Sequence, residues 1–189
     1  FATDEKARKI AIAAIAAGTR AETAWRVRPL ADDYVVVCES HSPSNVYCYT
    51  PGLAVAAQGR LVATMDFGGS GWKKEEPRGR IFVSDDRGKS WAQRASFPFL
   101  HARPFMAGKT LYVLGHAGDL MVVRSDDNGE TWSEAVKLTD KQNWHQSACN
   151  VWTANGCVYL VMERRVSQAI KSWPVGELAP VLLRGRLDA

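Results

Sequence analysis

Ser84-Asp85-Asp86-Arg87-Gly88-Lys89-Ser90-Trp91 is one of two closely similar stretches in this sequence. Ser125-Asp126-Asp127-Asn128-Gly129-Glu130-Thr131-Trp132 follows it 41 residues later and keeps the serine, both aspartates, the glycine and the tryptophan. In a tight turn between strands, an Asp side chain accepts hydrogen bonds from backbone N–H groups, and Gly supplies a residue with positive φ. The tryptophan then covers the turn with apolar surface. Each stretch therefore predicts a turn between two strands, and we call them the first and second repeat turns.

Glycine turns recur with a similar period around the repeat turns. Gly59, Gly108 and Gly156 each lie between two strand-like segments, at spacings of 49 and 48 residues. The predicted strands are 52–57, 60–66, 80–84 and 91–95, then 103–106, 109–115, 119–124 and 132–137, then 148–152, 157–163 and 181–187. Repeats of 40 to 50 residues built from short strands are typical of propeller blades. The sequence thus predicts an all-β fold, a β-propeller of four-stranded antiparallel blades.

The repeat turns fit the pattern S-x-D-x-G-x-[ST]-W, which is the Asp-box motif, and the chain resembles the sialidase (neuraminidase) superfamily of β-propellers. The resemblance implies six blades in a complete ring, whereas 189 residues hold about three. We therefore expect a fragment, with an N-terminal helix (4–17) and lead-in segment over residues 1–33 and a partial propeller over 34–189. The β-branched run 34–38 is predicted to be a strand.

Composition excludes some classes of partner. The net charge of +4 is small and spread along the chain, which gives no case for nucleic acid. No apolar run is long enough to insert into a membrane. A basic and then apolar order over residues 6–17 fits either a first helix or a secretory signal, and the resemblance makes a secreted or periplasmic location the expectation.

Four cysteines allow two disulfides without requiring them. Cys38 and Cys48 flank a loop, and their pairing stays open. Cys149 and Cys157 lie on consecutive strands, but the expected hairpin register places Cys149 near Met162, so no bridge is predicted there.

The topology of a blade separates structural turns from functional loops. In a four-stranded antiparallel blade, the glycine turns and the repeat turns share one face, and the longer loops lie on the opposite face, where function tends to sit. We call the opposite face the loop face; its loops are 47–51, 67–79, 97–104, 115–118, 140–147 and 164–180.

Hairpin register brings polar side chains together on the loop face. It places Pro51 opposite Asp66, with Thr50 beside Asp66; Arg103 opposite Tyr112, with His101 near His116; and Ala148 opposite Glu163, with His145 near Arg164. Three histidines with these carboxylates and arginines predict a polar pocket. Their spacing is not that of a zinc site, and neither a metal nor a cofactor is expected.

The resemblance adds roles for these residues. In sialidases a Tyr/Phe-Arg-Ile-Pro motif supplies an arginine that binds the substrate carboxylate, and the matching stretch here is Tyr49-Thr50-Pro51-Gly52. Because Thr50 stands at the arginine position, either Arg78 or Arg103 replaces it or the ligand is not a sialic acid. The resemblance makes Asp66 the candidate general acid and Glu163 a further catalytic candidate. Trp72 and Trp144 either stack on a sugar or pack against a neighbouring blade.

Two functions follow from these residues. One is a sialidase-like glycoside hydrolase that removes a terminal, anionic sugar from a glycan, with Arg103 or Arg164 holding that sugar. The other is a non-catalytic propeller that binds carbohydrate or protein, because the fold alone does not separate the two.

Overall fold

A computed structural model describes residues 34–145, 150–172 and 174–187 of the chain. The predicted helix and lead-in of residues 1–33 lie outside the described residues. Val35–Ala189 forms one compact unit, and its described elements are strands and two short 3-10 turns, η1 (Ala57–Gly59) and η2 (Val175–Glu177). No helix in this part of the chain is long and apolar enough to cross a membrane.

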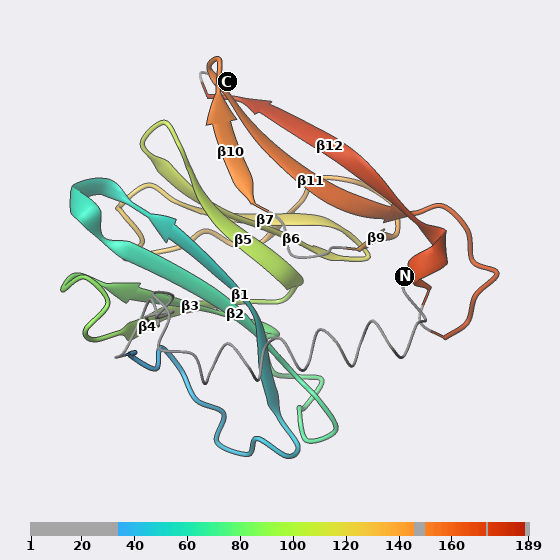
Figure 1. Cartoon of the computed structure of the whole chain (residues 1–189), viewed down its shortest axis with the longest axis horizontal. Helices are drawn as coiled ribbons and strands as arrows, with labels where there is room; N and C mark the ends of the chain where they lie inside the picture. Colours follow the sequence, from blue (N-terminus) through green and yellow to red (C-terminus); the bar gives the residue numbers. More distant parts are fainter. Residues whose placement is uncertain (1–33, 146–149, 173, 188–189) are drawn as a thin grey trace, which may run out of the picture. The chain divides into compact units, whose positions relative to one another are not determined.

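The strands form three four-stranded antiparallel sheets that follow one another along the chain (Figure 1). The first contains β1 (Tyr47–Val55), β2 (Leu61–Gly68), β3 (Gly79–Ser84) and β4 (Ala92–Phe97). The second contains β5 (Leu100–Ala107), β6 (Thr110–Ala117), β7 (Asp119–Ser125) and β8 (Val136–Lys137). The third contains β9 (Trp144–His145), β10 (Val151–Ala154), β11 (Cys157–Arg165) and β12 (Leu178–Arg186).

In the first two sheets the spatial order of the strands is their order in the chain, and β1 lies against β5. This is the arrangement of successive propeller blades, so the predicted fold class is confirmed. The third sheet follows the order β10-β11-β12, with the unpredicted strand β9 also paired to β11. Residues 34–38 are irregular rather than a strand; Val37 and Cys38 instead pack against the side of the first blade.

Apolar side chains between the blades form the core. Val62, Ile81 and Phe97 of the first blade pack with Phe99 and Val113, and the Phe97 and Phe99 rings lie 4.4 Å apart. A Cβ atom at Gly79 would lie 1.9 Å from the Phe97 ring, so only glycine fits there. A second interblade cluster joins the second and third blades through Leu114, Leu120, Trp144, Leu160 and Met162.

Two predicted hairpin registers are wrong, for identifiable reasons. Asp66 pairs with Tyr49 rather than Pro51, because η1 makes the first turn longer and β1 carries a register shift between Tyr49 and Gly52. Arg103 pairs with Leu114 rather than Tyr112, because Ala107 and Thr110 close a turn at Gly108-Lys109. The Asn155-Gly156 turn is confirmed by the pair Ala154 and Cys157. Ala148 lies outside the described residues, and Glu163 pairs with His145.

The hydrogen bonds predicted for the repeat turns are confirmed. In the first, Asp86 Oδ1 accepts from the Ser84 hydroxyl at 2.8 Å and from the Ser90 amide at 2.9 Å. The Gly88 amide donates to Ser84 Oγ at 2.8 Å with φ +86° at Gly88, and Trp91 Nε1 donates to the Gly88 carbonyl at 3.0 Å. The second repeat turn has the same bonds, through Ser125, Asp127, Gly129, Thr131 and Trp132.

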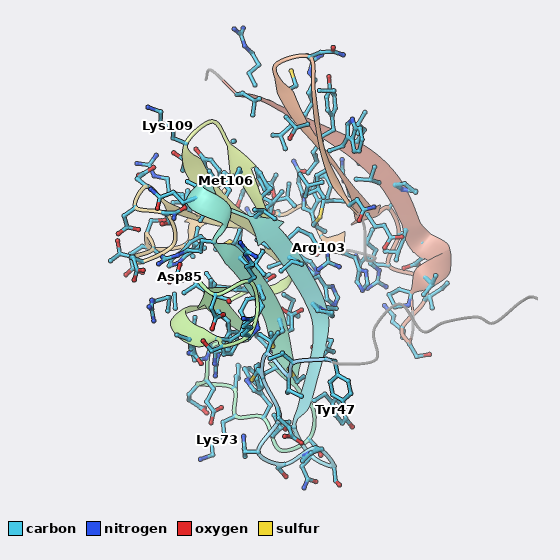
Figure 2. All side chains as sticks on the ribbon, turned by 60° about the vertical axis from the view of Figure 1, so that its left-hand side comes forward. Tyr47, Lys73, Asp85, Arg103, Met106 and Lys109 are labelled. Carbon is cyan, nitrogen blue, oxygen red and sulfur yellow. The ribbon has the colours of Figure 1, made fainter. Side chains whose placement is uncertain are left out.

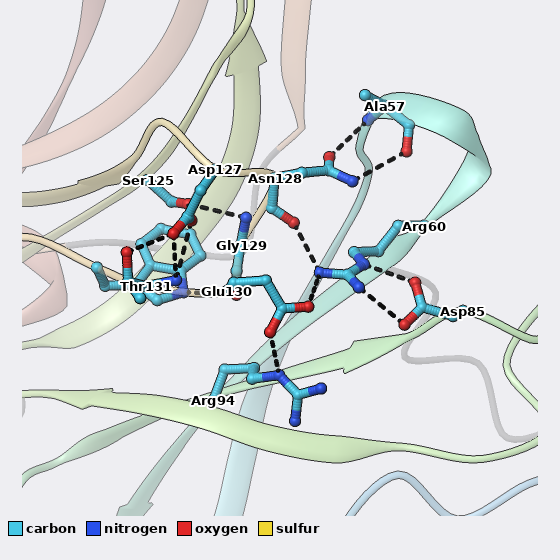
Figure 3. Close-up of polar contacts among 11 residues, drawn as sticks. Ala57, Arg60, Asp85, Arg94, Ser125, Asp127, Asn128, Gly129, Glu130 and Thr131 are labelled. Carbon is cyan, nitrogen blue, oxygen red and sulfur yellow. Dashed lines mark hydrogen bonds and ion pairs between the residues drawn. The ribbon is translucent and has the colours of Figure 1, made fainter.

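Arg60, at the start of the second strand of blade one, joins the two repeat turns (Figure 3). Its guanidinium donates to both carboxylate oxygens of Asp85, at 2.6 and 2.8 Å, and to the Asn128 carbonyl at 3.1 Å. It also pairs with Glu130, which in turn accepts from Arg94 at 2.9 Å. Since Asn128 also bonds to both backbone groups of Ala57, the glycine turn of blade one and the second repeat turn lie on one face, as predicted.

We predict that Arg60→Ala lowers the thermal unfolding midpoint by about 2–6 °C. The substitution leaves Asp85 and Glu130 without their shared cation, and the Arg60 side chain is only 13% exposed, so solvent does not fully replace it. Differential scanning calorimetry at low and high salt measures the effect, which added salt should reduce. Lys89→Ala, in an exposed part of the first repeat turn, is the control; equal midpoints for the two variants would contradict the role given to Arg60.

Candidate functional site

A buried carboxylate, Asp66, connects the first two blades on the loop face. Asp66 is 0% exposed, and its Oδ2 accepts a hydrogen bond from the Thr50 hydroxyl and another, at 2.6 Å, from the His101 backbone amide. Its Oδ1 is buried with no hydrogen-bond partner. Burial raises the pKa of Asp66 to about 6, against the hydrogen bonds from Thr50 and His101, which lower it. The predicted contact between Thr50 and Asp66 is confirmed.

His101 and His116 form a hydrogen-bonded pair beside this carboxylate. His101 Nδ1 lies 3.1 Å from His116 Nε2, so one ring nitrogen donates and the other accepts. Burial lowers the pKa of His101 to about 4 and that of His116 to about 3. Both rings are therefore neutral imidazoles near neutral pH. The predicted approach of these two histidines is confirmed.

His145 and Glu163 complete the cluster from the third blade. The His145 ring centroid lies 5.3 Å from that of His101 and 5.7 Å from that of His116. His145 Nδ1 is 3.6 Å from Glu163 Oε2, and the two side chains are 42% and 20% exposed. His145 and Glu163 are thus the members of the cluster that solvent and a ligand reach. The predicted convergence of three histidines is confirmed.

The cluster is built from corresponding positions in successive blades. Asp66 lies opposite Tyr49 at the end of β2, and His116 lies opposite Leu100 at the end of β6. In both blades the next residue of the first strand, Thr50 or His101, begins a register shift and has a left-handed backbone, with φ of +49° and +55°. Its side chain then reaches the partner on the second strand. The same local geometry therefore produces a Thr–Asp contact in one blade and a His–His contact in the next.

Arg103 places a cation beside Thr50. Its Nη1 donates to the Ala102 carbonyl at 2.9 Å and to the Thr50 carbonyl at 3.4 Å, and the residue is 6% exposed. Figure 2 shows Arg103 at a height between Lys109 and Met106 above it and Tyr47 and Lys73 below it. It borders a hollow of about 620 Å³ lined by the first strands of the three blades, β1, β5 and β10.

Tyr49, Arg78 and Trp72 lie on the side of the site formed by the first blade. The Tyr49 ring meets the His101 ring edge-on at 6.4 Å, and the Tyr49 hydroxyl and Arg78 Nη1 both lie beside Gly68. The Arg78 guanidinium lies 3.6 Å above the Trp72 ring. A Cβ atom at Gly68 would come within 3.0 Å of the Tyr49 hydroxyl and 3.1 Å of Arg78, so a side chain there would displace both groups slightly.

Two residues predicted to bind the substrate do not reach this cluster. Trp144 is only 7% exposed and packs in the core between the second and third blades, where it presents no ring face to a sugar. Arg164 is exposed, but as the residue after Glu163 in β11 its side chain leaves the opposite face of the sheet. Trp144 is therefore a packing residue, and Arg164 points away from Glu163.

Asp119 is a residue of this region that the sequence reading missed. It accepts hydrogen bonds from the Thr139 hydroxyl and from the amides of Lys141 and Gln142, all at 2.9–3.0 Å, and pairs with Lys137 at 2.9 Å. These contacts hold the pKa of Asp119 far below its usual value, with the Lys137 bond the largest cause. Asp119 thereby fixes the link that leads to His145. The only sequence signal was a lone acidic residue after Gly118.

The described residues contain no three His, Cys, Asp or Glu side chains arranged to hold one metal ion. The side chains of the cluster offer one buried carboxylate, one partly exposed carboxylate, the neutral imidazoles of His101 and His116, and neighbouring arginines. Such a set can exchange protons with a ligand and donate hydrogen bonds to hydroxyl or carboxylate groups.

No protein-family model matches the chain. Among curated proteins, it is 36% identical over 89 residues to the photosystem II assembly protein Ycf48 of Synechococcus sp. (strain JA-3-3Ab), a match that covers 43% of this chain and 26% of that protein. The chain thus spans about a quarter of the length of this relative.

Several solved structures are also similar to part of the chain. An alpha-L-arabinanase of Penicillium chrysogenum gives a TM-score of 0.44 at 18% identity, over 70% of this chain and 43% of that one. The K499G mutant of the NanB sialidase of Streptococcus pneumoniae gives 0.46 at 20% identity, over 71% and 20% respectively. At these TM-scores the fold assignment rests on the chain's own blades.

We predict that Asp66 makes the protein less stable as pH rises. The folded-state pKa, about 6, lies above the ordinary value of 3.8. The folded protein therefore holds a proton that the unfolded chain loses first. The contribution of Asp66 to the free energy of unfolding should fall by about 2 kcal/mol between pH 4 and pH 7.

Urea denaturation of the wild type and of Asp66→Asn gives the free energy of unfolding of each protein across this pH range. The difference between the two values isolates the effect of Asp66, because the titrations of His101 and His116 contribute to both and cancel. Asp126→Asn, at a carboxylate that is 63% exposed, should show no such slope. If the difference in free energy of unfolding between the wild type and Asp66→Asn stays constant with pH, the raised pKa of Asp66 in the folded protein is contradicted.

Proposed function

We propose that the loop face binds the terminal sugar of a glycan and that the protein containing this chain cleaves it as a sialidase-like glycoside hydrolase. The observation that carries the proposal is the cluster of His101, His116, His145 and Glu163 beside Asp66. Glycoside hydrolysis needs carboxyl groups at the reacting bond and hydrogen bonds to the sugar hydroxyls.

Glu163 is the better candidate for proton transfer. Its side chain is partly exposed and stands 3.6 Å from a histidine nitrogen, whereas Asp66 is fully buried and already accepts two hydrogen bonds. A general acid or base must reach the proton it moves. Asp66 remains a candidate acid only if ligand binding opens its surroundings; in the present geometry it supports His101.

The position of Arg103 supports an anionic substrate. Thr50 stands at the position where sialidases have an arginine that binds the substrate carboxylate. Arg103 brings a guanidinium to the Thr50 carbonyl. Arg78 lies near Tyr49, the residue before Thr50 in the same strand. Guanidinium groups bind carboxylates through paired hydrogen bonds, so a sialic acid or another acidic sugar suits this site.

The second candidate is a propeller that binds a partner without catalysis. The match to Ycf48, which is named as an assembly protein, supports this alternative over the 43% of the chain that it covers. The two candidates differ in one readout, because a binding module retains the glycan or protein without converting it.

We predict that Glu163→Gln lowers kcat/KM on the preferred aryl glycoside by about 100- to 10,000-fold, the range expected for removing an acid–base group. The full-length protein is first assayed on aryl sialosides, glucuronides and neutral aryl glycosides. Glu134→Gln, an exposed change beyond the second repeat turn, is the control. Normal turnover by Glu163→Gln would remove its catalytic role, and no turnover by the wild type on any glycoside would favour the binding module.

We further predict that Asp66→Asn keeps more activity than Asp66→Ala. The Asn amide oxygen can still accept the bonds from Thr50 and His101, whereas Ala leaves both donors unpaired in a buried site. Steady-state kinetics of the folded variants measure this. Equal loss in the two variants would return Asp66 to the role of general acid.

A further inference from the structure

Cys38 and Cys48 lie on the two sides of a narrow loop that leads into β1. The loop is closed by the Ser40 hydroxyl, which donates to the Val46 carbonyl at 2.6 Å. The amides of residues 45 and 46 both donate to the Ser42 carbonyl, at 2.9 and 2.7 Å. Each cysteine lies two residues outside the contact between Ser40 and Val46, so the closed loop brings both cysteines to the same side of the first blade.

Both thiols pack on the same apolar cluster. Its buried members come from Val46 and from the side of the first blade, including Met65 and Phe67, and Trp72 packs against the same cluster. Burial raises the pKa of Cys48 to about 11 and also raises that of Cys38. Cys157, the other free cysteine that the structure describes, lies on β11 in the third blade and is not part of this cluster.

We propose that Cys38 and Cys48 form a disulfide when the protein folds in an oxidising environment. The closed loop and the packing of both cysteines on one apolar cluster carry this inference. It does not depend on the proposed function, and it agrees with the proposal of a secreted or periplasmic location, since disulfides persist in such compartments.

The oxidation needs a small disulfide such as oxidised glutathione. One protein thiolate attacks that disulfide and releases one glutathione thiolate, and the second protein thiolate then attacks the mixed disulfide and releases the other. The protein loses two electrons and two protons, and the glutathione disulfide is reduced to two thiols. Because the thiolate is the nucleophile, the raised pKa values make this exchange slow once the protein is folded, so the bond forms during folding.

The cross-link would fix the part of the first blade that carries Tyr49 and Thr50. These residues follow Cys48 directly in β1, and Thr50 donates to Asp66. The same loop also supports the segment that carries Trp72, because the Gly71 amide donates to the Asn45 carbonyl at 2.9 Å. A disulfide here would therefore hold one wall of the site in place.

Peptide mapping of the full-length protein tests the bond directly. The protein is refolded with reduced and oxidised glutathione, its free thiols are alkylated in denaturant, and it is digested with trypsin without reduction. Residues 27–60 form one tryptic peptide with only Cys38 and Cys48, and residues 142–164 form another with only Cys149 and Cys157. We expect no alkyl group on peptide 27–60. When this peptide is cleaved a second time after Glu39, between the two cysteines, its two halves should separate only after the disulfide is reduced.

Thermal unfolding gives an independent measurement. The oxidised protein should melt roughly 5–10 °C above the reduced protein, the shift expected for closing a short loop. Cys38→Ser should abolish this difference, and Cys157→Ser should keep it. Two alkyl groups on peptide 27–60 after oxidative folding, or a redox-dependent midpoint that survives Cys38→Ser, would overturn the proposal.

Discussion

The arrangement of the loop face depends on one buried carboxylate. Asp66 accepts the Thr50 hydroxyl from its own blade and the His101 backbone amide from the next. Burying a charged carboxylate costs free energy that two hydrogen bonds only partly offset, as the raised pKa records. The Asp66 carboxylate fixes the backbone of His101 in its left-handed conformation by accepting the hydrogen bond from its amide. In that conformation the ring of His101 meets the ring of His116. The geometry of the histidine cluster therefore begins in the neighbouring blade.

Repetition explains how such a site arises without a special fold. A register shift at the same point of the first strand in two blades turns one side chain toward the end of the second strand. The blade supplies the position, and the residue type supplies the chemistry: Thr50 with Asp66 in one blade, His101 with His116 in the next. The third blade contributes Glu163 from the end of its second strand, paired there with His145 of β9. Function can change by substitution at these positions while the interblade packing stays the same.

The sequence predicted what depends on local chemistry and failed where distant segments decide. The repeat turns were predictable because their serine, aspartate and glycine bond within a few residues of each other. The register shift at Thr50 was not predictable from local sequence. It reflects the contact between Asp66 and the backbone amide of His101, which lies 35 residues further along the chain. For Trp144 the sequence left sugar stacking and packing against a neighbouring blade both open, and its ring fills the core between the second and third blades. The short strand β9 depends on Asp119, which has no local signature.

Exposure then separates support from chemistry within the cluster. Asp66, His116 and Arg103 are all buried, and the burial of Asp66 and His116 suits groups that hold others in place. His145 and Glu163 are partly open to solvent, which a group that exchanges protons with a ligand requires. Neutral imidazoles behind them add hydrogen-bonding capacity without adding charge, so Arg103 and Arg78 remain the cations nearest the site. A ligand that brings its own negative charge would complete this arrangement, whereas a neutral one would leave the arginines to their contacts within the protein.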